Sequence, residues 1–74
     1  MAEEVSNRIR DYRVKLDLTQ DDLAQAVGVS RQSIISIERG RYTPSLYLAF
    51  RLAKFFQCSV DELFKLKEED YYDK

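Results

Sequence analysis

The sequence predicts a small all-α domain of five short helices. Three observations lead to this prediction: apolar residues recur at helical spacing, Ser or Thr stands where most helices should begin, and both glycines lie where helices should end. With 74 residues, one cysteine and no histidine, the chain can form neither an internal disulfide nor a Cys/His zinc site. A compact helical core, with help from a second subunit, is therefore expected to supply the stability.

The expected helices follow one another closely. An apolar stripe predicts a first helix over residues 5–15, formed by Val5, Ile9, Tyr12 and Leu16. The later helices begin at the capping residues Thr19, Ser30, Ser45 and Ser59, and the fourth runs to about residue 56. Gly28 and Gly40 end the second and third helices. Residues 19–40 therefore form a helix-turn-helix unit, and no strand is expected.

The charge is distributed unevenly. The net charge is −1, but residues 8–60 carry nine basic and five acidic side chains, whereas residues 61–74 carry three basic and six acidic ones. We expect residues 1–66 to form the domain and residues 67–74 to form an acidic tail that frays. The central part of the chain can thus attract a polyanion in spite of the net charge.

The helix over residues 30–39 has an unusual outer side. Ile34 and Ile37 share its inner side, and the opposite side carries Gln32, Ile35, Ser36 and Arg39. Such a row suits the major groove of DNA, where Gln32 can bind adenine. Arg31, beside the row, can bind guanine. Ile35 would then meet the methyl group of thymine. The alternative is that Ile35 packs on a neighbouring helix or is simply exposed.

Other polar residues are suited to phosphates. Free N–H groups lie beside Gln20, at the start of the second helix. Donors around the start of the fourth helix come from Arg41, Tyr42, Thr43 and Ser45. Asp21 and Asp22 are expected to point away from the duplex.

Two opposite charges lie on apolar stripes. Arg13 lies within about 40° of Ile9 on the first helix, and Glu38 lies within about 40° of Ile34 on the third. Because either charge alone would be costly to bury, we expect the two to form a structural ion pair.

The last two helices carry more large apolar residues than the core needs. A homodimer interface is one interpretation, and isolated exposed residues are the other. The candidates are Leu46, Tyr47, Phe50, Phe55 and Phe64. Cys58 is interpreted as a small buried or boundary residue rather than a redox centre.

Residues 18–46, LTQDDLAQAVGVSRQSIISIERGRYTPSL, resemble the helix-turn-helix of the Cro/cI-like family of transcriptional regulators, also called the Xre family. The similarity extends over about residues 7–66, with SVDELF at 59–64 resembling the closing helix of the family. It implies a five-helix, lambda-repressor-like fold that binds double-stranded DNA through the third helix. By the same resemblance the residues facing bases are Arg31, Gln32, Ser33, Ile35 and Ser36. Gln20 would contact a phosphate and brace the third helix, and the residues meeting the DNA backbone would be Arg39, Arg41 and Tyr42.

Several classes of function are not expected. The chain offers no histidine, no Ser or Cys beside a base and no phosphate-binding glycine loop, so an enzyme, a metal, a cofactor or a small-molecule ligand is not predicted. No apolar run approaches the ~20 residues of a membrane span, and a cytoplasmic location is expected. The favoured function is a sequence-specific DNA-binding regulator, most simply a dimeric repressor. The alternative is a protein-interaction module of the same fold, an antitoxin or a transcriptional adaptor, in which DNA contact is secondary.

Overall fold

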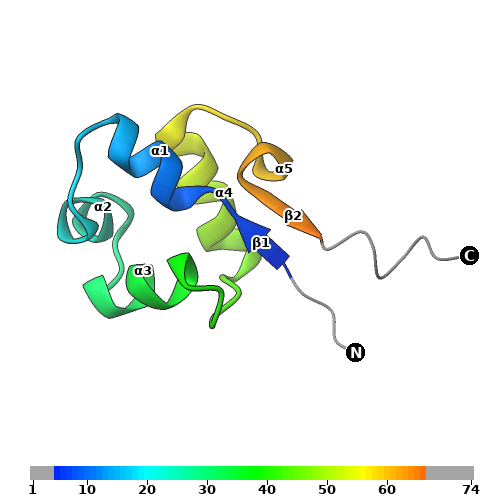
Figure 1. Ribbon diagram of the computed structural model, residues 1–74, viewed down its shortest axis with the longest axis horizontal. Helices are drawn as coiled ribbons and strands as arrows, with labels where there is room; N and C mark the ends of the chain where they lie inside the picture. The colour runs from blue at the N-terminus through cyan, green and yellow to red at the C-terminus, as the bar shows by residue number, and fades with distance from the viewer. Residues whose placement is uncertain (1–4, 67–74) are drawn as a thin grey trace, which may run out of the picture.

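The structure, a computed structural model, describes residues 5–66, so the expected acidic tail at 67–74 lies outside the described part. Five helices occur in it: α1 (Ile9–Lys15), α2 (Gln20–Val27), α3 (Arg31–Glu38), α4 (Leu46–Phe56) and α5 (Val60–Leu63). Figure 1 shows α2 and α3 together at one end of the domain, away from α5. The predicted five-helix fold is confirmed.

The expectation that no strand occurs is wrong. β1 (Val5–Asn7) pairs antiparallel with β2 (Phe64–Leu66), with Val5 opposite Leu66. The first helix therefore begins at Ile9, whose N–H donates to the side-chain oxygen of Asn7 at 3.1 Å. Local periodicity predicts a helix at Val5 because its strand partner, Leu66, is distant in the sequence, and the spacing of nearby residues gives no signal of that pairing.

The helix starts agree with the predicted caps. Thr19 and Asp22 form a reciprocal capping box: the Thr19 hydroxyl accepts from the Asp22 N–H, and the Asp22 carboxylate accepts from the Thr19 N–H, each at 2.9 Å. Ser30, Ser45 and Ser59 each accept a hydrogen bond from the backbone N–H three residues later. These contacts satisfy backbone donors that helix geometry leaves unpaired and fix where each helix starts.

Every helix contributes to one core. The fully buried large side chains are Ile9, Leu23, Ile34, Ile37, Leu52 and Leu63. The ring centroids of Tyr12 and Phe56 lie 5.5 Å apart, so α1 packs against α4. Leu16, expected on the inner stripe, is instead exposed, because α1 ends at Lys15.

A tight turn connects α2 to α3. Gly28 has φ +81°, and the N–H groups of Gly28 and Val29 both donate to the carbonyl of Ala24, at 2.9 and 3.0 Å. This left-handed conformation favours glycine. It lets α3 place Ile34 and Ile37 in the core while its other side remains at the surface.

Candidate nucleic-acid interface

The surface side of α3 carries the five residues that the sequence assigns to bases. Arg31 and Gln32 are exposed. The other three, Ser33, Ile35 and Ser36, are half-buried. At about 100° per residue, Gln32 points directly away from the core. One flank of the helix carries Arg31 and faces the start of α2, whereas the other carries the two serines.

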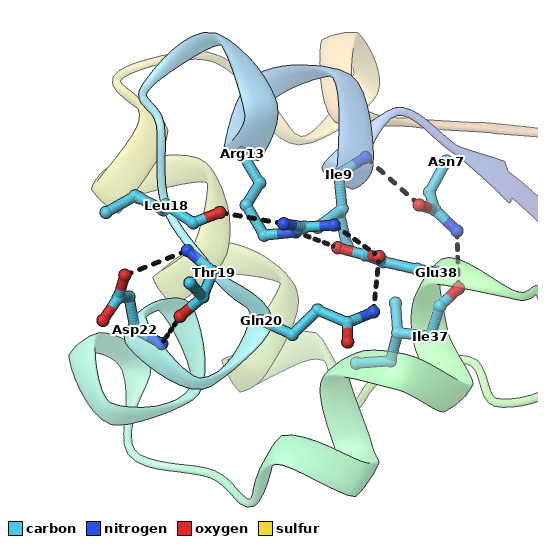
Figure 2. A network of polar contacts seen from close by, with 9 residues as sticks. All are labelled: Asn7, Ile9, Arg13, Leu18, Thr19, Gln20, Asp22, Ile37 and Glu38. Carbon is cyan, nitrogen blue, oxygen red and sulfur yellow. Dashed lines mark hydrogen bonds and ion pairs between the residues drawn. The ribbon is translucent and has the colours of Figure 1, made fainter.

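A polar network fixes α3 against α1 and α2 (Figure 2). The Arg13 guanidinium donates from Nε to Glu38 Oε2 at 2.7 Å and from Nη2 to Glu38 Oε1 at 3.2 Å. Its Nη1 donates to the carbonyl of Leu18 at 2.8 Å. This bidentate contact between the Arg13 guanidinium and the Glu38 carboxylate sets the orientation of both side chains. It connects the last turn of α3 to α1 and to the segment before α2.

Gln20 joins the same network. Its Nε2 donates to Glu38 Oε1 at 3.1 Å, so Gln20 braces α3 (Figure 2). An amide nitrogen has two N–H groups, and this contact uses one of them. Gln20 can therefore hold Glu38 and still offer a donor to a phosphate.

Asn7 provides a second brace, from the strand side. Its Nδ2 donates to the carbonyl of Ile37 at 2.8 Å, while its Oδ1 accepts from Ile9 (Figure 2). Sequence reasoning did not identify this residue, because its role depends on where the strand pair places it.

A basic groove of about 530 Å³ is formed by α1, the start of α2 and the flank of α3. It is lined by Arg10, Arg13, Thr19, Gln20, Asp21, Arg31, Glu38 and Arg39. Within residues 5–66, Arg10, Arg31 and Arg39 form no ion pair, whereas Glu38 is already neutralised by Arg13. The groove thus presents more positive than negative charge, although Asp21, expected to point away, also lines it.

Arg10 is a residue that sequence reasoning missed. It lies on α1, outside the helix-turn-helix motif, so the motif gives no signal for it. The available signal was its position three residues before Arg13, which places both on neighbouring parts of one helix surface.

The segment after α3 is held close to the helix. Gly40 has φ +77°, its N–H donates to Ile37, and the N–H of Arg41 donates to the carbonyl of Ser36 at 2.9 Å. Arg41, Tyr42 and Thr43 are exposed. The hydroxyl of Ser45 accepts from the Leu48 N–H at 3.1 Å, so this residue caps α4 and keeps only its own O–H for another contact.

Comparison with known proteins agrees with this geometry. A helix-turn-helix family profile matches residues 9–63. An uncharacterized HTH-type transcriptional regulator of Methanocaldococcus jannaschii is 47% identical over 66 residues, which span 89% of this chain and 100% of that protein. The chain belongs to the Cro/cI-like (Xre) helix-turn-helix family.

Two further relatives of this regulator are repressors. The RstR transcriptional repressor of a cryptic CTXphi phage in Vibrio cholerae is 35% identical over 69 residues, 93% of this chain and 62% of that protein. The P22 c2 repressor, solved in complex with a synthetic operator, shares 41% identity with a TM-score of 0.75 over 78% of this chain and 88% of that one. The chain is thus a transcriptional regulator with a DNA-binding fold and not an enzyme.

The described residues offer neither a reactive cysteine nor a metal site. Cys58 is free and half-buried, and burial raises the pKa of its thiol, which disfavours the reactive thiolate. Within residues 5–66, no three His, Cys, Asp or Glu side chains gather where they could hold a metal ion. No helix of that part is long and apolar enough to cross a membrane.

The first part of α4 carries exposed apolar side chains. The exposed fractions of Leu46, Tyr47 and Phe50 are 71%, 70% and 57%. Phe55 is less exposed and packs edge-on against Phe56, and Phe64 is half-buried against the core. We call the first three residues the α4 patch. Of the five interface candidates, these three leave the most surface uncovered.

Proposed function

We propose that the protein is a sequence-specific repressor that inserts α3 into the major groove of an operator as a homodimer. The observation that carries the proposal is the combination of an exposed polar row on α3 with the basic groove beside it. The exposed donors of the row, with Arg31 beside them, suit base edges, and Arg10 and Arg39, which form no ion pair within residues 5–66, suit phosphates.

Phosphate contacts would come from both flanks of α3. On one side Arg10 and Arg39 line the basic groove, with Gln20 at the start of α2. On the other side the segment after α3 exposes Arg41 and Thr43, with Ser45 at the start of α4. Anchors on both flanks would fix the depth and orientation of the helix in the groove, which is the task of backbone contacts.

Base contacts would come from α3 itself. Arg31 and Gln32 are exposed and have the planar donor groups that bind guanine and adenine through two hydrogen bonds. Ser33, Ile35 and Ser36 would add hydroxyl and apolar contacts at its flanks. Because Glu38 is held by Arg13 and Gln20, the helix is already in place before DNA arrives.

A second copy would cover the α4 patch. Three large apolar side chains on adjacent turns are more than scattered exposure usually gives, and a two-fold interface buries the same patch on both subunits. A dimer would read two half-sites about one helical turn, ~34 Å, apart. A dimer bound to an operator would block a promoter that overlaps it, and transcription would be repressed. The repressors among the relatives support repression rather than activation.

The experiment is selection of the purified protein on a randomised duplex pool, followed by a salt titration of the enriched sequence. We expect an inverted repeat with half-sites one turn apart and a steep salt dependence. Weak salt-sensitive binding without enrichment would contradict the proposal. It would favour the interaction module, in which the α4 patch binds a different protein.

A further inference from the structure

A hollow separate from the basic groove lies between the end of α2 and the outer side of α4. Its volume is about 360 Å³, and it is lined by Ala26, Val27, Arg51, Lys54 and Phe55. None of these residues takes part in the DNA contacts proposed above. The hollow thus combines an apolar wall with two cations and has no assigned role.

Both cations of the hollow lack an acidic partner. Within residues 5–66, neither Arg51 nor Lys54 forms an ion pair, and α4 contains no Asp or Glu. The Arg51 guanidinium lies 5.9 Å from the centroid of the Tyr47 ring. Its Nη1 donates to the Tyr47 hydroxyl at 3.3 Å, and its Nη2 donates to the Ala26 carbonyl at 3.5 Å. These contacts position the guanidinium without neutralising its charge, so a carboxylate can still bind there.

The apolar wall of the hollow favours a peptide over a phosphate. Val27 is buried, and Phe55 packs edge-on against Phe56 with 36% of the residue exposed. A phosphate would be attracted by the two cations but would gain nothing from this wall. An aromatic side chain flanked by carboxylates would bury apolar surface and meet both charges. The chemistry of the hollow therefore selects an acidic segment that contains aromatic residues.

The chain itself carries a segment of this composition. Residues 68–72 read EEDYY, three consecutive acids followed by two tyrosines, and no other run of three acids occurs in the sequence. This stretch follows β2 and lies outside the described residues. Charge complementarity with Arg51 and Lys54 thus indicates residues 67–74 as the occupant of the hollow.

The position of β2 favours the hollow of a second copy over that of the same chain. Figure 1 shows β2 on the side of the domain away from α2, whose end forms one wall of the hollow. From Leu66 to Asp70 the chain spans at most about 14 Å even when extended. That span is less than either short dimension of the molecule, 22 and 21 Å. A second copy can approach from any direction, so its acids have no such restriction.

We propose that residues 67–74 of one subunit dock in this hollow of a second copy, with the carboxylates of residues 68–70 on Arg51 and Lys54 and a tyrosine ring against Phe55. The inference rests on the homodimer of the proposed function but does not require α3 to bind DNA. The contact would adjoin the α4 patch, because Tyr47 of the patch bonds to Arg51. A two-fold dimer would make this exchange twice, and its affinity would then fall as salt rises.

The first test measures the dimer Kd of the full chain by sedimentation equilibrium, without DNA and at low salt. One variant neutralises the segment with Glu68→Gln, Glu69→Gln and Asp70→Asn, and the other neutralises the hollow with Arg51→Gln and Lys54→Gln. Each should raise the Kd about tenfold, as a few exposed ion pairs predict. The two sets combined should weaken the dimer no more than either set alone, because both remove the same contact.

A matched control removes the same charge elsewhere. Lys15 and Lys65 are exposed and do not line the hollow, so Lys15→Gln with Lys65→Gln should change the dimer Kd less than twofold. An equal loss in this control would mean that the net charge, and not the hollow, sets the affinity, and it would overturn the inference.

The second test locates the contact. Tyr71 is replaced in the full chain by the photoreactive p-benzoylphenylalanine, and light should yield a covalent dimer whose cross-link maps to Ala26, Val27 or Phe55. A cross-link within one chain, or a wild-type dimer whose Kd is unaffected by both sets of substitutions, overturns the inference and leaves the proposed function intact. A wild-type chain that stays monomeric at low salt would overturn the inference together with the homodimer, whereas the operator selection tests DNA binding separately.

Discussion

Arg13 and Glu38 join the first and third helices through two hydrogen bonds in a site nearly closed to solvent. The shorter bond, from Arg13 Nε to Glu38 Oε2, measures 2.7 Å, and the two side chains are 12% and 6% exposed. Glu38 also accepts from Gln20, at the start of α2. One carboxylate thus connects the first three helices and fixes the position from which α3 presents Arg31 and Gln32.

Removal of one member of this pair should be costly. Arg13→Ala leaves the Glu38 carboxylate buried with Gln20 as its remaining side-chain donor, so we expect the free energy of unfolding to fall by about 3–5 kcal/mol. The double variant Arg13→Met, Glu38→Leu should recover most of that loss, since no charge is then left in the interior. Urea unfolding followed by circular dichroism measures both. A loss below about 1 kcal/mol in Arg13→Ala would mean that water reaches Glu38 and that the pair has little structural effect.

The features that could be predicted from the sequence are those with local causes. Thr19 and Ser30 stand one residue before α2 and α3, and a capping hydrogen bond spans only three residues. Arg13 and Glu38 could be matched because each charge lies on the apolar side of its own helix, and the structure brings them together.

The features that were missed depend on contacts between distant parts of the chain. Val5 fits a helical stripe as well as a strand, and only Leu66 beside it favours the strand. Asn7 becomes a brace because the strand pair directs it to Ile37. Likewise Tyr42 lies on the flank of α3 because the chain turns at Gly40. From the sequence, Gly40 predicts that the helix ends but not in which direction the chain continues.

Gln57 offers a route to higher stability. It ends α4 with φ +59°, a left-handed conformation that is unfavourable for residues with a Cβ. Its side chain is exposed and makes no hydrogen bond among the described residues, so we expect Gln57→Gly to raise the free energy of unfolding by about 0.5–1 kcal/mol.

Gly28→Ala is the matched opposite of that change. Gly28 has φ +81°, and a Cβ there would meet no atom within 4 Å, so only backbone strain opposes alanine. We expect a loss of about 1–2 kcal/mol in the same unfolding assay. If Gln57→Gly proved destabilising, the flexibility gained by the unfolded chain would outweigh the relief of strain.

Asp22 should make the domain sensitive to acid. The backbone N–H of Thr19 and then its side chain lower the pKa of the Asp22 carboxyl below its ordinary value of 3.8. A group with a lowered pKa in the folded state stabilises the fold above its unfolded pKa and loses that contribution as the pH falls through the folded one. The stability gap between wild type and Asp22→Asn should therefore be full at pH 6 and shrink below about pH 3.8. Urea titrations at pH 6 and pH 3 measure the gap, and a constant value would exclude a role of the charged carboxylate in the cap.

The α4 patch should control the oligomeric state. Phe50→Glu places a charge at the centre of the proposed interface, and we expect the sedimentation coefficient to shift to that of a monomer. Val14→Glu is the matched control, because Val14 on α1 is 58% exposed and Phe50 is 57% exposed. If both variants sediment like the wild type, the interface lies elsewhere; if both dissociate, the effect is not specific to α4.

Gln32 and Arg41 should affect DNA binding in different ways. Gln32 points away from the core on α3, so Gln32→Ala should weaken operator binding by about 1–3 kcal/mol while leaving binding to a scrambled duplex nearly unchanged. Arg41 lies exposed after α3, so Arg41→Ala should weaken binding to both duplexes similarly and reduce the slope of log K against log salt by about 1. Kd values on the two duplexes at four salt concentrations separate these effects. Equal losses on both duplexes for Gln32→Ala would remove Gln32 from the base-reading set, and an unchanged slope for Arg41→Ala would remove Arg41 from the phosphate set.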